Sequence, residues 1–412
     1  MQDHQKFFPV RDANDPDRVS NRFVAISNVD SRDVDAVRDG YERVIRPRLA
    51  DARFFLEQDQ SRPLEGYLAG LDGVVFQKKI GTVGDKSRRI AFVSEKMAEL
   101  LGYDPKLAAR SAMLAKCDLM TQMVGEFPEL QGVMGHHYAL ISGEPEEVAV
   151  AIGEHYAPAF AGDSIPNNTA GRIVGIADRA DTLVGIFAAG LRPTGNKDPF
   201  ALRRGALGMV RILLEGGLQL PLNRILALAA NALSDQLPTD PALLVEIRGF
   251  VVERLRHYYR EQDYSAELIS AALASGWDTL PDLDRRLVAL SGFMGQDAAA
   301  SLAAANKRIG NILRKAGEEI SDEIDAERLV LDAEKTLFEE LHAIEKTIAP
   351  LLEAGDYSSS LTHLADLRAP VDAFFDSVMV MDEDPRLRGN RLALLARLKS
   401  QFDRIADLSV LG

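Results

Sequence analysis

One strand stands out in an otherwise helical sequence, and this imbalance restricts the fold more than any other feature. The strand, Phe23–Ser27, is bounded by polar turns and precedes an arginine-rich helical run over Val34–Glu57. A lone strand has no partner for its backbone hydrogen bonds, so it cannot form a sheet. We therefore predict a mainly α, multi-domain protein in which residues 1–60 are a small remnant of a larger α/β unit, with further chain expected upstream.

Glycine and proline residues divide the rest of the chain into three helical stretches. We predict a helical domain over 61–190, a helical body over 191–290 and a third helical domain over 291–412. The body is predicted to begin with Asp198 as the N-cap of a helix and Pro199 as its first residue. We find no internal repeat and no low-complexity linker between these stretches.

Two predicted helices in the third stretch separate apolar and basic residues onto opposite faces. They cover Ser301–Ala316 and Asn390–Leu408. The basic face of the first carries Lys307, Arg308, Asn311, Arg314 and Lys315, and that of the second carries Arg397 and Arg404. Clustered cations are typical of a surface that binds phosphate, although snorkelling side chains on a solvated surface give the same pattern.

The overall charge makes these basic faces more informative. The chain has 62 acidic and 48 basic residues and a net charge of -14, so a polyanion must bind a local basic patch. The acidic stretch Glu318–Glu340 lies between the two basic helices, and we predict that its face stays solvated. We do not expect DNA as a partner. No apolar run reaches the roughly 18 residues that a membrane span needs, so we expect no membrane partner either.

The cysteine and the histidines do not indicate a reactive or metal centre. Cys117 is the only cysteine, which excludes a disulfide framework and favours a reducing compartment, the cytoplasm. Lys116 beside it can lower a thiol pKa, but no histidine partner is evident, so we do not predict a nucleophile. His136, His137 and His155 lack the spacing of a metal-binding motif, and we predict surface or supporting roles for them.

The segment Gly81–Ser87 has the residue types of a phosphate-binding loop without their spacing. That loop needs two glycines five positions apart, with lysine directly after the second. Here Gly84 follows Gly81 by three positions and precedes Asp85, whose charge would repel a phosphate. We therefore predict a turn.

The most unusual string is Asn196–Gly208, which leads into a helix with three arginines, Arg203, Arg204 and Arg211. The predicted buried side of this helix consists of Leu202, Ala206, Met209 and Leu213. Two interpretations stay open. The arginines pair with acidic neighbours, or they contact RNA phosphates or another subunit.

Several long strings resemble the family of bacterial glycyl-tRNA synthetase beta subunits. They are His4–Val10, Glu42–Phe55, Val74–Ser87, Leu114–Gly135, Ile176–Phe187, Asn196–Gly208, Ala303–Leu313 and Leu387–Leu398. The strings are ungapped and the resemblance covers nearly the whole chain, which makes it specific. Members of this family carry a further N-terminal region, so we expect this chain to be a C-terminal fragment.

The resemblance implies a heteromeric class II synthetase, a heterotetramer in which an alpha subunit holds the glycine and ATP site. The beta subunit then supplies tRNA binding for glycyl-tRNA aminoacylation, and its expected partners are the alpha subunit and tRNA(Gly). We find no class I signature and no class II ATP-binding arginine motif, so we expect no catalytic residue in this chain. ATP and Mg would serve the holoenzyme, and we expect this chain to bind no cofactor.

The resemblance also implies the folds of two regions. Residues 61–190 resemble an HD-type helical domain, a fold otherwise used for metal-dependent phosphohydrolysis. That chemistry needs a histidine before the aspartate, and here the degenerate positions are Cys117, Asp118, Asp178 and Asp181. We therefore expect no metal. Residues 291–412 resemble the all-helical anticodon-binding domain shared with arginyl-tRNA synthetase, which contains both basic helices. The alternatives are a phosphohydrolase that uses the HD-like domain and a non-catalytic assembly scaffold.

Overall fold

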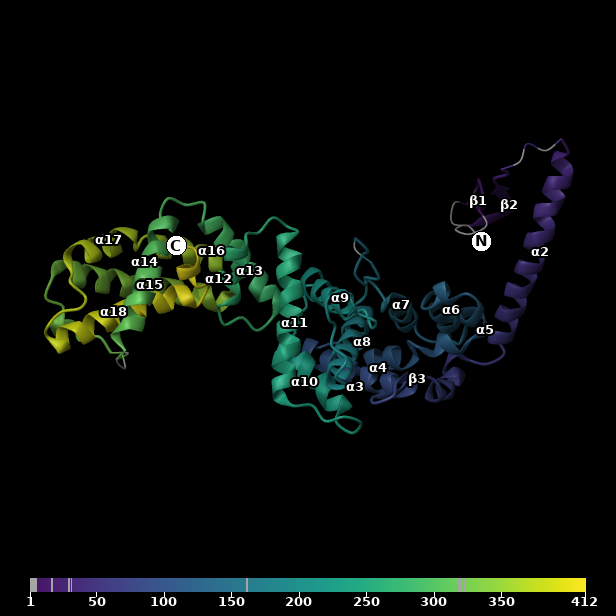
Figure 1. Cartoon of the computed structure of the whole chain (residues 1–412), viewed down its shortest axis with the longest axis horizontal. Helices are drawn as coiled ribbons and strands as arrows, with labels where there is room; N and C mark the ends of the chain where they lie inside the picture. Colours follow the sequence, from purple (N-terminus) through teal and green to yellow (C-terminus); the bar gives the residue numbers. More distant parts are fainter. Residues whose placement is uncertain are drawn as a thin grey trace.

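The structure is a computed structural model that describes residues 6–15, 18–28, 30, 32–160, 162–317, 320–321 and 323–412. It is mainly α-helical, as the sequence predicted. The molecule is elongated, with the N-terminal helix α2 (Val34–Asp59) at one end and a C-terminal helical bundle at the other (Figure 1). No helix in the described part of the chain is both long enough and apolar enough to cross a membrane.

The N-terminal strand has a partner that the sequence did not predict. Strand β1 (Phe7–Arg11) pairs antiparallel with β2 (Val19–Ala25), so the prediction of a lone strand over Phe23–Ser27 was wrong. Pro9 lies inside β1 and has no N–H to donate, and the register shifts between Pro9 and Arg11. A proline within a short segment argues against a strand in the sequence, which is why β1 was not predicted. His4, which belongs to the first family-like string, lies outside the described residues.

Helix α2 confirms the helical run predicted over Val34–Glu57. The Asp33 carboxylate caps its first turn by accepting a backbone N–H, which is the usual role of aspartate at this position. The ring of Phe7 packs edge-on against Tyr41 of α2, with ring centroids 5.5 Å apart. The small hairpin is therefore held against this helix by aromatic contact.

Residues 61–190 form a helical unit around α3 (Val83–Leu101), α4 (Pro105–Leu114) and α8 (Thr169–Ala188), which contact one another. The other elements of this unit are β3 (Val75–Gln77), β4 (Gly81–Thr82), α5 (Gln122–Glu126), α6 (Val133–Ile141), α7 (Glu146–Glu154) and 3-10 segments over Leu64–Gly73, Cys117–Met120 and Pro128–Leu130. Helices α3 and α8 are nearly free of exposed residues on their facing sides, and this packing places several charged side chains in the interior.

The segment Gly81–Ser87 is not the turn that was predicted, because it forms β4 and the first turn of α3. Thr82 and Asp85 form a capping box, in which each side chain accepts the backbone N–H of the other. The backbone hydrogen bond from Thr82 is the main reason that the pKa of Asp85 is lowered to about 2. Gly81 has φ +88°, a left-handed conformation that favours glycine.

Residues 191–293 add five helices to the same core. They are α9 (Leu202–Glu215), α10 (Leu222–Leu233), α11 (Pro241–Arg260), α12 (Ala266–Leu273) and α13 (Leu280–Phe293). The prediction that a helix starts at Asp198 and Pro199 was wrong in position, because α9 begins at Leu202. The Asp198 carboxylate nevertheless accepts the N–H groups of Leu202 at 2.8 Å and Arg203 at 2.9 Å. The cap therefore acts across a turn in which Ala201 has φ +52°.

One hydrophobic cluster runs from Ile80 to Leu287, so helices on both sides of residue 190 share a core. A smaller cluster is formed by buried residues between Leu64 and Ile152, and another fills the C-terminal bundle from Ala271 to Leu408. The predicted boundary at residue 290 falls inside α13. The domain boundaries stay predictions.

The C-terminal bundle consists of α14 (Ala299–Ala316), α15 (Asp332–Ala354), α16 (Tyr357–Ala365), α17 (Arg368–Ser377), α18 (Pro385–Asp403) and short 3-10 segments over Ala326–Arg328 and Leu408–Val410. The first predicted basic helix, Ser301–Ala316, is confirmed by α14. The second was predicted over Asn390–Leu408, but α18 starts and ends earlier. Asp384 caps it and Pro385 is its first residue, a combination that fixes the helix start.

Candidate nucleic-acid interface

Helix α14 separates its apolar and basic side chains as the sequence predicted. Leu302 and Ile309 are buried in the bundle. The exposed residues of the opposite face are Lys307, Arg308, Asn311, Arg314 and Lys315. This cationic face is therefore present on the surface, although its role as a tRNA contact stays a prediction.

The cations of α14 differ in what they already contact. Lys307 donates a hydrogen bond from Nζ to the backbone carbonyl of Gly412. The guanidinium of Arg308 lies 4.2 Å from the ring centroid of Phe375 on α17. The side chains of Arg314 and Lys315, in the last turn of α14, have no ion pair with any residue that the structure describes. The C-terminal end of this face is therefore the most available to a ligand.

The second basic patch contains one engaged and one exposed arginine. Arg397 of α18 donates from Nε to Oε1 of Glu345 on α15 at 2.8 Å, and from Nη2 to the other carboxylate oxygen. This hydrogen-bonded pair raises the pKa of Arg397, and Gln401 donates to the same carboxylate at 3.0 Å. Arg404 follows the end of α18 and is exposed, with no ion pair to a described residue. Glu345 therefore neutralises much of the charge that the sequence assigned to this patch.

The predicted solvated acidic face needs a correction at Glu334. This side chain is fully buried, because it caps α15 and binds Arg391 of α18, which is also buried. The neighbouring Asp325 is partly exposed and pairs with Arg328 at 2.9 Å. Glu318, Glu319 and Asp322, which belong to the same predicted face, lie outside the described residues.

In the region predicted to be HD-like, Lys86 of α3 and Lys116, which precedes the 3-10 segment Cys117–Met120, both contact Asp178 of α8. Lys86 binds Oδ1 of Asp178 at 2.7 Å, and Lys116 binds Oδ2 at 2.7 Å. Lys86 also lies 3.1 Å from Asp181, which accepts a hydrogen bond from Arg89 at 2.5 Å. We call Lys86, Lys116, Asp178 and Asp181 the lysine–aspartate centre. Burial opposes the charge on Asp178, but Lys116 and Lys86 outweigh it and hold its pKa well below the usual range.

His155 completes this centre as a neutral imidazole. Its Nδ1 lies 2.7 Å from the carbonyl oxygen of Ile152, which can only accept, so Nδ1 carries the proton. Nε2 is then an acceptor for the ammonium of Lys116, 2.8 Å away. Burial, followed by the charge of Lys116, lowers the pKa of His155 well below its usual value. The sequence predicted surface or supporting roles for the three histidines, and of these two roles His155, which is buried, has the supporting one.

Among the described residues, the side chains of Cys117 and Asp118 make no hydrogen bond or ion pair with the lysine–aspartate centre, although the charge of Lys116 acts on Asp118. Asp118 is buried and accepts the backbone N–H groups of Gly132 at 2.6 Å and Gly135 at 3.1 Å. Cys117 is also buried, and the loss of solvation raises the pKa of its thiol to about 12. Such a thiol is a weak nucleophile, as we expected when we did not predict Cys117 to be reactive.

The lysines were not predicted as site residues. Lys86 is one of the buried charges of α3, whose buried face also contains Arg89 and two serines. A lysine among apolar helix positions is the signal that would have drawn attention to it. Among the described residues, no group of three or more histidine, cysteine, aspartate or glutamate side chains is placed to hold a metal ion. The ammonium groups surround the aspartate that would otherwise ligate one.

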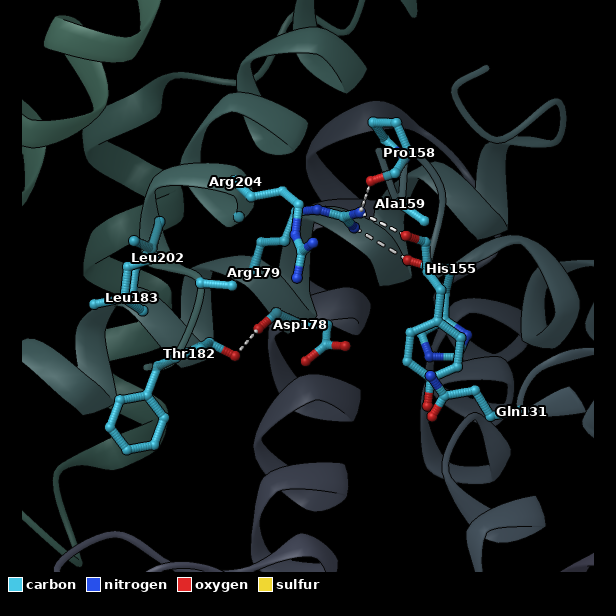
Figure 2. Close-up of a pocket in the computed structure, with 14 residues that line it drawn as sticks. Gln131, His155, Pro158, Ala159, Asp178, Arg179, Thr182, Leu183, Leu202 and Arg204 are labelled. Carbon is cyan, nitrogen blue, oxygen red and sulfur yellow. Dashed lines mark hydrogen bonds between the residues drawn. The ribbon is translucent and has the colours of Figure 1, made fainter. Parts of the chain in front are cut away.

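A pocket of about 400 Å³ lies over this centre. Figure 2 shows Asp178 between Arg204 on one side and His155 on the other. Arg179 turns away toward the backbone and donates to the carbonyls of His155, Tyr156, Ala157 and Pro158, as the dashed lines in Figure 2 partly show. The guanidinium of Arg179 therefore holds the backbone of the pocket wall in place through these hydrogen bonds.

The sequence left open whether the α9 arginines pair with acidic neighbours or contact RNA or another subunit, and the structure shows that the three arginines differ in this respect. Arg211 pairs with Glu215 at 2.7 Å, as the ion-pair interpretation predicted, and Arg203 donates to the carbonyl of Gly195 at 2.7 Å. Arg204 is exposed at the pocket and has no ion pair with a described residue. The predicted buried side of the helix is confirmed, because Leu202, Ala206, Met209 and Leu213 are all buried.

The C-terminal bundle with its exposed cationic helix defines a class of protein. Residues 302–410 match the DALR anticodon binding domain, so the chain carries an anticodon-binding module. Residues 1–274 match the glycyl-tRNA synthetase beta subunit. The chain belongs to the glycyl-tRNA synthetase beta subunit family, and the resemblance seen in the sequence is confirmed.

Curated relatives agree with this assignment along the whole chain. The chain is 47% identical over 415 residues to the glycine–tRNA ligase beta subunit of Methylobacillus flagellatus. The matched region covers 100% of this chain and 58% of that protein. It is 46% identical over 411 residues to the protein of the same name from Vibrio parahaemolyticus, covering 59% of it. The chain therefore spans less than two thirds of the length of these relatives.

Proposed function

We propose that this chain binds tRNA(Gly), including its anticodon arm, so that a partner alpha subunit can attach glycine in an ATP-dependent reaction. The observation that carries the proposal is the anticodon-binding module together with the exposed cations of α14. The chain would contribute binding and orientation, which lower the barrier for a reaction whose chemistry lies in another subunit. ATP and Mg would bind in the holoenzyme, a cytoplasmic heterotetramer, and not on this chain.

Within α14 we assign two kinds of contact. Arg314 and Lys315, with Arg308 and Lys307, would bind phosphates of the anticodon loop. Glycine codons begin with two guanines, so each glycine tRNA presents two cytosines, whose exocyclic amines need acceptors. Asn311 lies in the middle of this face and offers both a donor and an acceptor, so we propose it as a base contact.

The second patch would contribute less than its sequence suggested. Glu345 already holds Arg397 in a two-point pair, so a phosphate would have to share or displace that partner. Arg404 has no such competitor among the described residues. We therefore propose Arg404 as the main phosphate contact of this patch and keep Arg397 as a weaker one. Arg203, Arg204 and Arg211 remain a tRNA or subunit contact.

The competing phosphohydrolase function has less support. It requires a divalent metal on the HD positions, whereas both oxygens of Asp178 are occupied by ammonium groups. A metal would have to displace the ammonium groups of Lys86 and Lys116 from a largely buried carboxylate, which is electrostatically unfavourable. We propose that the lysine–aspartate centre is structural and that this chain binds no catalytic metal.

Salt-dependent filter binding with tRNA(Gly) tests the main proposal. Replacing Arg314 and Lys315 with alanine should lower the log–log salt slope by about 1.4 to 1.8, at about 0.7–0.9 per phosphate contact. A matched control is Arg43→Ala, an exposed position on α2 at the other end of the molecule (Figure 1). Unchanged affinity and slope in the double variant would favour the scaffold alternative.

A second arm tests base reading. Asn311→Ala should reduce the preference for tRNA(Gly) over a transcript with uridines in place of the anticodon cytosines by about tenfold, with the salt slope unchanged. Loss of affinity for both transcripts alike would show that Asn311 does not read a base.

A further inference from the structure

A groove of about 470 Å³ lies between α9 and α11, beside the pocket of Figure 2. Its walls carry both arginine and aromatic side chains. The residues that matter here are Phe160, Arg203, Arg204, Arg211, Arg254 and Tyr258. In Figure 1 these two helices lie in the middle of the molecule, away from α14 in the C-terminal bundle. The groove is therefore separate from the anticodon-binding module.

The groove is locally positive in an acidic protein. Four arginines line it, and the carboxylates beside them are Glu261, a lining residue, and Glu215 and Asp163, which both interact with the charge of Arg211. Four positive and three negative charges leave a net charge of about +1 when His257 is neutral. His257 lies 3.3 Å from Glu261 and would add to the positive charge when protonated.

Two of these arginines, Arg204 and Arg254, have no ion pair with a described residue. Arg204 is exposed and has no ion pair with a described residue. The guanidinium of Arg254 lies 5.3 Å from the ring centroid of Phe250, and its buried Nε has no hydrogen-bond partner in the described chain. A buried donor without a partner is unfavourable, so a shift of the Arg254 side chain that brings Nε onto an acceptor such as a phosphate oxygen would stabilise this wall.

Aromatic side chains complete the chemistry. Phe160 is 65% exposed at the groove, and Tyr258 is half-buried in the same groove. Arginine with an exposed aromatic ring is the combination that proteins use for single-stranded RNA, because the cation binds the phosphate and the ring stacks on an unpaired base.

The groove also continues into the pocket over the lysine–aspartate centre. Pro158 and Arg204 line both cavities, so a chain that follows the arginines of α9 reaches the pocket mouth at Arg204. The pocket offers about 400 Å³ with Gln131, Phe200 and Leu202 among its lining residues, which suits a single flipped base.

We infer that this groove is a second RNA-binding site, which binds the phosphates and an unstacked base of a single-stranded RNA segment. The inference rests on the proposed tRNA binding and extends it to a site outside the anticodon-binding module. The two exposed positions, Arg204 and Phe160, have distinct roles in it. Arg204 contacts phosphate, and Phe160 stacks on a base.

Fluorescence anisotropy with a single-stranded RNA hexanucleotide that lacks the glycine anticodon, and with tRNA(Gly), tests the site. Arg204→Ala should reduce the salt slope for the hexanucleotide by about 0.7, the value for one phosphate contact on a single strand. Phe160→Ala should weaken binding by about fivefold or more and leave the salt slope unchanged, because stacking releases no counterion. Both residues are exposed, so neither variant is expected to unfold the chain.

Two further variants separate this inference from the proposed function. Arg260→Ala, an exposed position on α11 outside the groove, should bind both RNAs like the wild type. The α14 variant Arg314→Ala with Lys315→Ala should lose affinity for tRNA(Gly) but not for the hexanucleotide. If the groove variants bind both RNAs normally while the α14 variant loses tRNA, the groove inference is wrong and the proposed function stands.

A last outcome concerns a protein ligand. If Arg204→Ala and Phe160→Ala leave RNA binding unchanged but weaken binding to a purified alpha subunit, the groove is a protein interface and the inference is overturned. If the groove variants lose tRNA and the α14 variant does not, the second RNA site stands and the assignment of the anticodon contacts fails.

Discussion

Lys116 donates a hydrogen bond to Oδ2 of Asp178 at 2.7 Å, while the other carboxylate oxygen is held by Lys86. This pair of contacts argues against a metal site in the region predicted to be HD-like. In a metal site the aspartate would bind a divalent cation, whereas here two ammonium groups supply the compensating charge from within the fold. The centre can therefore stabilise the packing of α3 against α8 without a metal.

Removing the charge of Asp178 should strongly destabilise the chain. Asp178→Asn leaves the buried ammonium of Lys116 without a carboxylate and leaves Lys86 with Asp181 as its only carboxylate among the described residues, and the free energy of unfolding should fall by about 3–5 kcal/mol. Trp277, the only tryptophan, lies in the hydrophobic cluster that includes α3 and α8, so its fluorescence reports urea unfolding of this core. Asp51→Asn, at an exposed position of α2, is the control. A loss below about 1 kcal/mol would show that the centre contributes little.

Stability should fall as the pH drops below about 6.5, because His155 is neutral in the folded chain and protonates when the chain unfolds. The pKa of His155 is lower in the folded chain than in the unfolded chain. The stability that comes from keeping this imidazole neutral is therefore complete above the unfolded-state pKa of about 6.5 and is lost as the pH falls below it. The slope should approach about 1.4 kcal/mol per pH unit between pH 5 and 6. Asp178, whose pKa is also lowered, acts only below about pH 4.

A glutamine at position 155 tests this assignment. His155→Gln keeps a donor for the Ile152 carbonyl and an acceptor for Lys116, so the pH slope should flatten while the fold persists. His257→Gln, at an exposed position of α11, should retain the slope. An unaltered slope in His155→Gln would assign the pH dependence to other groups.

Cys117 should resist alkylation in the folded chain. With a thiol pKa of about 12, only about one molecule in ten thousand carries the thiolate at pH 8, and the sulfur is fully buried. Intact-mass measurement after iodoacetamide should show no adduct under native conditions and one adduct in concentrated urea. Rapid modification of the native chain would mean that the region around residue 117 opens readily.

We expect substitution of Arg397 to affect mainly stability and substitution of Arg404 to affect mainly tRNA binding. Arg397→Ala removes the two-point pair with Glu345 and should lower the free energy of unfolding by about 1–2 kcal/mol. Arg397→Lys should recover only part of this loss, since lysine cannot reproduce the planar pair. Arg404→Ala should leave stability unchanged and weaken tRNA(Gly) binding, as measured by urea titration and filter binding. Equal effects of both substitutions on tRNA binding would contradict the division.

Local pattern accounts for what the sequence predicted well. The two faces of α14 follow from a 3.6-residue period, which depends only on neighbours three and four positions apart. The buried side of α9 was correct for the same reason, although the start of the helix was not. Pro199 follows a good capping residue, but the chain turns once more before Leu202, and a local rule does not contain that turn.

The family resemblance rested on contiguous strings, so it too was available from the sequence alone, as was the mainly α class. What only the tertiary structure decided was the partner of each charge. Lys116 and Asp178 are 62 residues apart, and Arg397 and Glu345 are 52 apart. Which distant carboxylate meets which cation depends on how the helices pack, and periodicity carries no information about that packing. For this reason the sequence identified the basic faces, whereas the fold determined which of their cations are neutralised and which face solvent.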